Sequence, residues 1–249
     1  ELQSRISQIR KSAAKNSFQN GELLSLANDC ICQNADKNLL HQLLDIAHLS
    51  YVSIHIHKTK QTDIWFNYLL EIIQLSRFNV GYLLKQRAEK YKGKIAFFVI
   101  KNGELSNISY SSLWKKVVEI GKGLSSFNNR DLRPTIGLLT YNQLNGALVD
   151  LACLSFGFKI IPIPLNSTSE HASYIINHSE ITHLFIGGEN AEKIWNDIRH
   201  SHDIVTIAMS EANQITDYSI NWDSFLSNGD FVQDFDVNRQ LSNIDMNAI

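Results

Sequence analysis

The chain has 249 residues, of which 44% are hydrophobic and 19% charged, with a formal net charge of −2 at pH 7. This composition is typical of a globular protein that can bury a sizeable core, and the near-neutral balance gives no argument for nucleic-acid binding. No run of about 18 apolar residues predicts a membrane span, and the polar start ELQSRISQIRKSAAK has no apolar core of a signal peptide.

The cysteine content and the charge distribution add two expectations. Cys30, Cys32 and Cys153 are an odd set without a disulfide pattern, so we expect a reduced, cytoplasmic protein. Residues 80–133 hold 11 Lys and Arg against 4 Asp and Glu, whereas residues 189–249 hold 3 against 11. The simpler interpretation is that both segments place their charges on solvent-exposed faces and that the two net charges offset each other. The alternative is that residues 80–133 form a basic face for the phosphates of a nucleotide or coenzyme A.

Residues 1–78 predict an all-helical extension, with helices over residues 2–15, 21–33, 37–49 and 62–77. Asp63 is the expected cap of the last helix, whose apolar face, with Trp65 and Ile72, is too wide to face solvent alone. His55 and His57 alternate with apolar residues, which indicates a short extended piece.

The next segment, residues 79–127, predicts a helix, a hairpin and a second helix. A helix is expected over residues 79–91, and strands over residues 95–100 and 105–110 flank the turn signal Asn102-Gly103. A helix then starts at Ser111 or Ser112. It carries Gly121-Lys122-Gly123, which we interpret as helix packing because this triplet lies on a helix and lacks the third glycine of a phosphate-binding turn after a strand.

From residue 135 the chain alternates strands and helices, which predicts a parallel sheet with right-handed crossovers. Strands are expected over residues 135–139, 160–163, 182–186 and 204–208, and helices over residues 142–156, 167–177 and 189–199. Gly157 is the predicted left-handed cap of the first helix, and Ser167 with Glu170 forms the expected capping box of the second. Pro162 and Pro164 make the second strand short or place it near an edge.

The end of the chain is polar and irregular from Glu211. Trp222 and Phe225 are the residues expected to anchor it, and the final LSNIDMNAI resembles the lead-in to a strand.

Two stretches carry a resemblance to a known family. They are LSFGFKIIPIPLNSTSEHASYIINHSE, residues 154–180, and ISYSSL, residues 108–113. In this order and spacing they resemble the core motifs of AMP-forming acyl-CoA synthetases of the adenylate-forming superfamily, particularly long-chain fatty-acid–CoA ligases. NNRDLRP, residues 128–134, departs from the family's usual Gly-Asp pair. The resemblance covers residues 79–249 and implies a partial N-terminal α/β domain behind the extension of residues 1–78.

The resemblance also implies an activity and its cofactors. Family members use ATP and Mg²⁺ to convert a carboxylic acid to an acyl-adenylate and then transfer the acyl group to coenzyme A. Their Ser/Thr/Gly-rich phosphate loop, ending in Pro-Lys-Gly, is missing from these 249 residues. We therefore expect that the chain ends before this loop, contains no catalytic, cofactor-binding or metal-binding residue, and is inactive by itself.

The histidines do not alter this expectation. His41 and His48, His55 and His57, and the set His171, His178 and His183 lack zinc-site spacing, which favours surface or capped positions. The alternative to an enzyme part is a non-catalytic scaffold, in which the helical extension binds a protein partner beside a degenerate nucleotide-type α/β domain. The sequence beyond residue 249 would discriminate the two, since only the enzyme needs the phosphate loop.

Overall fold

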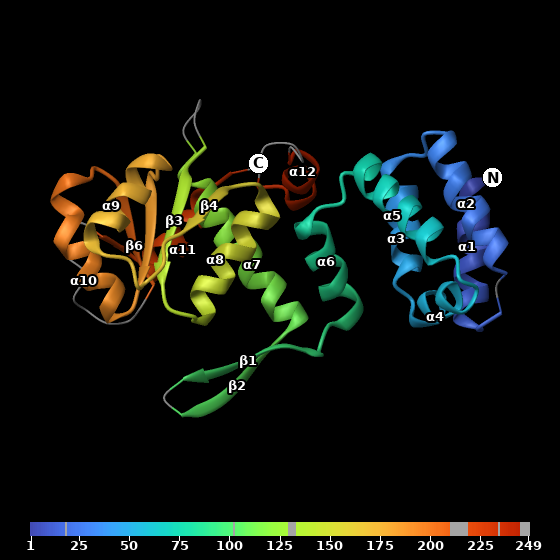
Figure 1. The fold of residues 1–249 in the computed structure, drawn as a ribbon, viewed down its shortest axis with the longest axis horizontal. Helices are drawn as coiled ribbons and strands as arrows, with labels where there is room; N and C mark the ends of the chain where they lie inside the picture. Colours follow the sequence, from blue (N-terminus) through green and yellow to red (C-terminus); the bar gives the residue numbers. More distant parts are fainter. Residues whose placement is uncertain (18, 102, 129–132, 210–218, 234, 245–249) are drawn as a thin grey trace. The chain divides into compact units, whose positions relative to one another are not determined.

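The protein was analysed as a computed structural model that describes residues 1–17, 19–101, 103–128, 133–209, 219–233 and 235–244. The chain divides into two compact units, Glu1–Asn79 and Val80–Ile249, each of which is described by itself (Figure 1). No helix among the described residues is long and apolar enough to cross a membrane.

The first unit is entirely helical. Its helices are α1 (Leu2–Ala14), α2 (Asn20–Cys32), α3 (Lys37–Ala47), α4 (Ser50–Lys58) and α5 (Thr62–Ser76). They enclose a core that includes Leu23, Leu26, Leu40, Leu43 and Ile72. The four predicted helices are confirmed, and the fold class of an all-α extension before an α/β domain is therefore confirmed for this part.

Two local predictions in this unit were wrong. His55 and His57 lie on the helix α4, which the alternating pattern had indicated as extended. Val52 and Ile56, four residues apart, are buried on one helix face, while Ile54 between them is 53% exposed. Asp63 does not cap α5, because the helix already includes Thr62 and its N-cap position is Gln61.

The second unit is built on a five-stranded parallel sheet. Its strands are β3 (Thr135–Thr140), β4 (Lys159–Pro162), β5 (His183–Gly187), β6 (Val205–Ala208) and β7 (Ser219–Asn221), in the order β4-β3-β5-β6-β7. Ile136 faces Ile160 in the ladder to β4 and His183 in the ladder to β5. The predicted α/β fold is confirmed, including the edge position of the strand that carries Pro162.

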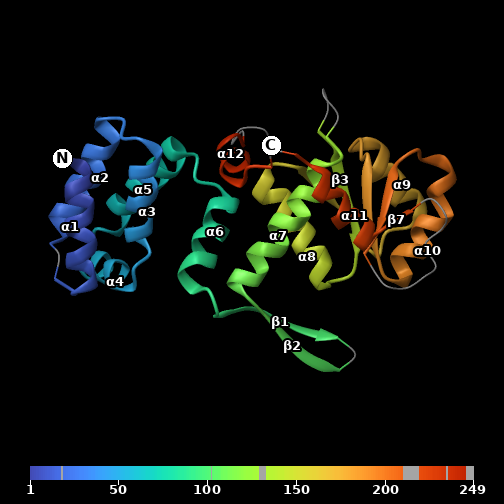
Figure 2. The same ribbon diagram turned by 180° about the vertical axis from the view of Figure 1, so that it is seen from behind.

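Helices cover both faces of this sheet (Figures 1 and 2). One layer contains α7 (Tyr110–Ser125), α8 (Leu144–Phe156) and α11 (Trp222–Asn228), with α6 (Val80–Tyr91) packed against α7 and α8. Its core joins Val117, Val149 and Phe225 to Phe185 of the sheet. The other layer contains α9 (Ser169–His178) and α10 (Glu189–Ile198), whose Ile176 and Trp195 pack with Leu184 and Ile186.

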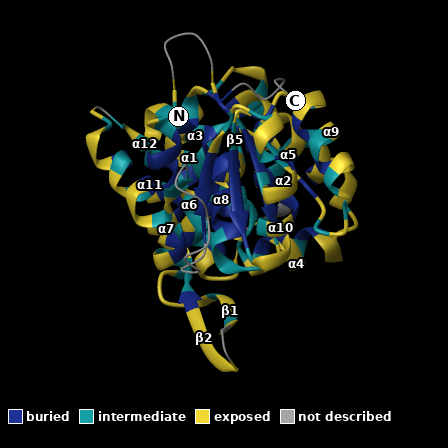
Figure 3. Ribbon diagram, turned by 90° about the vertical axis from the view of Figure 1, so that its left-hand side faces the viewer, coloured by how far each residue is buried: buried dark blue, intermediate teal, exposed yellow. Residues whose placement is uncertain are grey.

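An antiparallel hairpin precedes the sheet and is separate from it. Its strands are β1 (Ile95–Lys101) and β2 (Glu104–Ser109), with Ile100 opposite Leu105. Gly103 in the turn has φ +81°, as the predicted turn requires, and Asn102 lies outside the described residues. Figure 3 shows that most of the hairpin is exposed.

The crossover around β4 was predicted correctly except at one cap. Gly157 ends α8 in the left-handed conformation, with φ +72° and ψ +33°, which confirms its predicted role. The cap of α9 is Thr168, whose hydroxyl accepts a hydrogen bond from the His171 backbone N–H at 3.2 Å, so the predicted start at Ser167 was one residue early. Glu170 then lies in the first turn, where hydrogen bonds from its own backbone N–H and from Thr168 lower its pKa.

Towards the end of the chain, Phe225 is fully buried against Phe185 and Phe127, and Trp222 packs on it as expected. The short helix α12 (Val237–Ser242) includes the first two residues of LSNIDMNAI, and the expected lead-in to a strand stays a prediction. Residues 245–249 of that stretch lie outside the described residues, as do residues 129–132 of NNRDLRP and residues 211–218.

Candidate functional site

A cleft with a volume of about 1810 Å³ lies in the second unit at the carboxyl ends of the parallel strands. It is lined by Thr140 at the end of β3, Pro162 at the end of β4, Met209 just after β6 and Asn221 at the end of β7. The chain leaves β3 to form β4 on one side of it and then β5 on the other. Ligands of open α/β sheets bind where the strand order reverses in this way.

The lining of the cleft is apolar along two sides. The hairpin strand β1 contributes four consecutive residues, most of the others come from the end of β3, from β4 and the residues after it, and from α8, and Met209 and Trp222 complete the set. These apolar residues are Phe97, Phe98, Val99, Ile100, Leu138, Leu144, Ala147, Pro162, Ile163, Pro164, Leu165, Met209 and Trp222. Such walls suit a hydrocarbon ligand, because an apolar surface removed from water by a ligand is stabilised by the hydrophobic effect.

Polar side chains at the cleft connect strand ends that are far apart in the sequence. Gln143 Nε2 donates to Thr140 Oγ1 at 2.7 Å, and Thr140 Oγ1 donates to the Gly187 carbonyl at 3.1 Å. Asn145 Nδ2 donates to the Met209 carbonyl at 3.1 Å. These bonds hold the ends of β3, β5 and β6 in fixed positions around the cleft.

Gly187 and Gly188 let the end of β5 approach these side chains closely. A Cβ on Gly187 would meet Gln143 Nε2 and would lie 2.6 Å from Thr140 Oγ1. Gly188 has φ +97°, and a Cβ there would lie 2.7 Å from Tyr141 Cδ1. The glycine pair is therefore needed both for the backbone conformation and for the contact between β3 and β5.

The charge of the cleft is weakly negative. Asp150 of α8 and Asp223 of α11 are its carboxyl groups, and no Lys, Arg or His occurs among the lining residues that the structure describes. Burial raises the pKa of Asp150, and burial together with the Asp150 charge raises the pKa of the neighbouring Cys153 thiol well above its usual range. The N–H donors of two amide side chains in the lining, Gln143 and Asn145, already donate to Thr140 Oγ1 and to the Met209 carbonyl.

The histidines considered from the sequence do not converge on this cleft. His183 lies at the opposite end of β5, where its ring contacts Phe127 with a centroid distance of 4.3 Å. Burial lowers its pKa to about 4, so it is neutral at pH 7. His202, which was not considered from the sequence, directly follows η1 (Arg199–Ser201), and its Nε2 lies 2.8 Å from Ser173 Oγ of α9. Within the described part of the chain, no three His, Cys, Asp or Glu side chains are placed to hold a metal ion.

Gly121 and Gly123 act in packing, as the sequence indicated. Both are buried on α7, where a Cβ on Gly121 would overlap the Phe156 ring and a Cβ on Gly123 would lie 2.7 Å from Phe225 Cζ.

The cleft residues themselves were missed by sequence reasoning. Tyr141, Gln143, Asn145 and Asp150 follow β3 within ten residues. The available signal was a polar stretch, TYNQ, directly after a buried strand in a parallel α/β pattern, which is where such folds place their sites.

Comparison with solved structures agrees with this fold. A mutant form of coronafacic acid ligase from Pectobacterium brasiliense is similar with a TM-score of 0.51 and 18% identity, over 60% of this chain and 29% of that chain. A protein described as a putative long-chain-fatty-acid CoA ligase from Rhodopseudomonas palustris is similar with a TM-score of 0.51 and 11% identity, over 59% of this chain and 36% of that chain. At these identities the likeness concerns the fold alone.

The sequence itself defines the family. Residues 84–236 match the family described as AMP-binding enzyme, and the chain belongs to this family. It is also 32% identical over 97 residues to fatty acyl-CoA synthetase A of Dictyostelium discoideum, a match that covers 38% of this chain and 14% of the length of that protein. The recognition of an adenylate-forming enzyme from the two sequence stretches is thereby confirmed.

Proposed function

We propose that this chain is the N-terminal part of an AMP-forming acyl-CoA synthetase whose substrate is a fatty acid. In the parent protein, the acid carboxylate would attack the α-phosphate of ATP to give an acyl-adenylate and pyrophosphate. The thiol of coenzyme A would then attack the acyl carbon, and AMP would leave. The family match over residues 84–236 is the observation that carries this proposal, and the relative named fatty acyl-CoA synthetase A supports the choice of acid.

The cleft at the carboxyl edge of the sheet is the part of this site that the chain itself would supply. Its apolar walls from β1, β4 and α8 fit the hydrocarbon part of an acid. Its described lining carries no cationic side chain, and no described cluster fits a metal ion. Because the phosphate loop of the family is missing from these 249 residues, we assign ATP phosphates and Mg²⁺ to no residue of this chain, and we expect the 249-residue chain alone to release no pyrophosphate.

A bulky side chain in the cleft of the parent protein tests this assignment. Ala147 lines the cleft from an exposed position on α8, so Ala147→Trp would narrow the cleft without disturbing the core. We expect kcat/KM for a long acid to fall by about tenfold or more, because pocket size discriminates substrates at this scale. The assay is acid-dependent exchange of pyrophosphate into ATP, followed by coenzyme-A-dependent release of AMP.

The matched control is Leu154→Trp, on the same helix at a position that is 45% exposed and not part of the cleft lining. Its kinetics should equal those of the unchanged parent protein. Equal effects of the two substitutions on kcat/KM would contradict the assignment of the acid to this cleft. A parent protein without acid-dependent exchange of pyrophosphate into ATP would overturn the proposed activity. Turnover by the 249-residue chain alone would contradict its expected inactivity.

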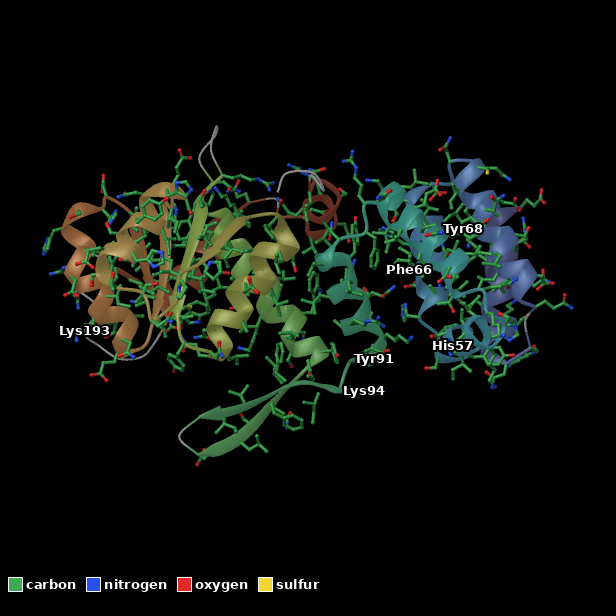
Figure 4. The ribbon with its side chains drawn as sticks, in the orientation of Figure 1. His57, Phe66, Tyr68, Tyr91, Lys94 and Lys193 are labelled. Carbon is green, nitrogen blue, oxygen red and sulfur yellow. The ribbon has the colours of Figure 1, made fainter. Side chains whose placement is uncertain are left out.

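The role of residues 1–78, a protein partner for them and a cytoplasmic location stay predictions. The first unit exposes Phe66 at 56% and Ile64 at 50% on α5, which keeps the interaction-module alternative open for this helix (Figure 4).

A further inference from the structure

One side of the helix α8 forms a wall of the cleft and carries a single charged group. Ala147 and Asp150 line the cleft three residues apart, and Gln143 lines it just before the helix begins, so the three follow one side of α8. Asp150 is the one charged residue of α8. Leu154, the next residue at this spacing, does not line the cleft, so Asp150 lies at the far end of the wall.

No cation compensates the Asp150 carboxylate within the described cleft. The walls from β1 and from the residues after β4 are apolar, and the described lining holds no Lys, Arg or His. The second carboxyl group, that of Asp223 in the first turn of α11, has the same sign of charge and is exposed. The described cleft therefore presents negative charge and no positive charge to a ligand.

The Asp150 carboxylate is partly removed from water and has no partner among the described residues. Burial alone raises its pKa, since neither a hydrogen bond nor a neighbouring charge contributes. The salt bridges between described residues belong to Asp29 and Asp45 of the first unit. A carboxylate in this state is screened less than one in bulk water, so its charge acts more strongly on a ligand group nearby.

The position of Asp150 corresponds to the distal end of a bound acid. The reacting carboxylate of the acid belongs near the carboxyl ends of the strands, where open α/β sheets bind their ligands. Gln143 lies there, hydrogen-bonded to Thr140 at the end of β3. Asp150 is seven residues further along, about 10 Å at the rise of a helix, so a hydrocarbon chain that follows the wall brings its far end to this carboxylate.

We propose that Asp150 selects the class of acid that the cleft accepts, by excluding acids with a second, distal carboxylate. Monocarboxylic acids bind with their methyl end near Asp150, and a distal ammonium group is tolerated there. This inference rests on the proposed function, because it concerns the acid held in the same cleft.

Two effects act on a charged distal group, and they can be separated. Transfer of any charge from water to an apolar cleft is unfavourable, whatever its sign. The Asp150 charge adds repulsion for a carboxylate and attraction for an ammonium group, and like-charge repulsion of this kind excludes wrong partners from binding sites. When Asp150 is neutralised, the cost of burial stays the same. The resulting change in the preference for a distal ammonium over a distal carboxylate therefore reports the charge of Asp150.

The experiment compares dodecanoic acid, dodecanedioic acid and 12-aminododecanoic acid as substrates of the parent protein at pH 7. Acid-dependent exchange of pyrophosphate into ATP measures kcat/KM, and displacement of a fluorescent fatty acid measures binding without turnover. We expect kcat/KM for 12-aminododecanoic acid to exceed that for dodecanedioic acid by about tenfold or more, because the two distal charges interact with Asp150 with opposite sign.

Two variants and one control test the role of Asp150. Asp150→Asn keeps the size of the side chain and removes its charge, so the ratio of these two kcat/KM values should fall by about tenfold while kcat/KM for dodecanoic acid changes little. Asp150→Lys should reverse the preference and make dodecanedioic acid the better substrate of the two. The matched control is Glu119→Gln on α7, which removes an exposed carboxylate that does not line the cleft and should leave the ratio unchanged.

Three results would overturn the inference. One is equal use of dodecanedioic acid and 12-aminododecanoic acid by the unchanged parent protein. Another is a ratio that Asp150→Asn and Glu119→Gln change equally. The third is failure of all three acids to displace the fluorescent fatty acid. If the acids bind with the expected preference and no exchange of pyrophosphate occurs, the proposed activity is wrong and the selection by Asp150 is supported.

Discussion

The contact between α7 and α8 depends on Gly121. The effect of Gly121→Ala on the free energy of unfolding should depend on whether Phe156 of α8 is present. An Ala in the interior of a helix normally stabilises it by about 0.5–1 kcal/mol relative to Gly. Here the added Cβ would overlap ring atoms Cδ2 and Cε2 of Phe156, which is 1% exposed. Overpacking of a core costs about 1–3 kcal/mol, so the net effect of Gly121→Ala should be destabilising.

The Phe156→Ala background reverses this expectation. Phe156→Ala itself should cost about 3–5 kcal/mol, since it removes a buried ring that contacts Trp114 and Phe235. With the ring gone, the three atoms nearest to the added Cβ are absent, and Gly121→Ala should stabilise the protein by about 0.5–1 kcal/mol. The coupling energy of the double-mutant cycle is therefore expected to be about 1–3 kcal/mol.

Urea unfolding followed by tryptophan fluorescence measures the cycle once Trp65, the tryptophan of the first unit, is replaced by Phe in every variant, because Trp114, Trp195 and Trp222 all belong to the second unit. Gly21→Ala on α2 is the control, because a Cβ there meets nothing within 4 Å and should be neutral or stabilising. Equal effects of Gly121→Ala in the two backgrounds would refute the contact on which the argument depends.

Three further predictions concern the same unit. Gly157→Ala should lower the free energy of unfolding by about 1 kcal/mol, because φ is +72° and the added Cβ would lie 3.2 Å from Arg133 Nη1. An unchanged melting temperature would count against the left-handed cap at this residue. Below its unfolded pKa of 6.5, His183 gains a proton on unfolding and stays neutral in the folded protein down to its folded pKa of about 4, so stability should fall as the pH drops from 6.5 towards 4. In His183→Gln, the free energy of unfolding measured against pH should no longer show this fall. If the fall persists, another titrating group causes it. Thr140→Val should cost about 1–2 kcal/mol by leaving Gln143 Nε2 and the Gly187 carbonyl without their shared partner, and Thr135→Val at the other end of β3 is the control, expected to melt like the unchanged chain.

Local chain chemistry determined much of this fold without tertiary information. The helix cap at Gly157 follows from the low cost of positive φ for a residue without Cβ. The edge position of β4 follows from Pro162, which has no N–H to donate to a neighbouring strand. The order of strands and helices from residue 135 was sufficient for the parallel sheet, since crossovers of one hand join such strands.

Tertiary packing decided the elements whose local pattern was ambiguous. Val52, Ile54 and Ile56 alternate as in a strand, yet they lie on α4, because the helical core of the first unit accepts Val52 and Ile56 and leaves Ile54 in solvent. Ser167 and Thr168 both offer a hydroxyl for a helix cap, and the turn after β4 brings Thr168 to the His171 N–H.

The candidate site depended on tertiary structure most of all. Thr140 meets Gly187 across 47 residues and Asn145 meets Met209 across 64. The period of a helix or strand covers only a few residues, so no local pattern can bring these groups together. The sequence by itself indicated the family and the alternation of strands and helices as far as β6. The order of the strands in the sheet was decided by the tertiary structure, and the cleft exists because the parallel ladder aligns the carboxyl ends of strands that are far apart in the chain.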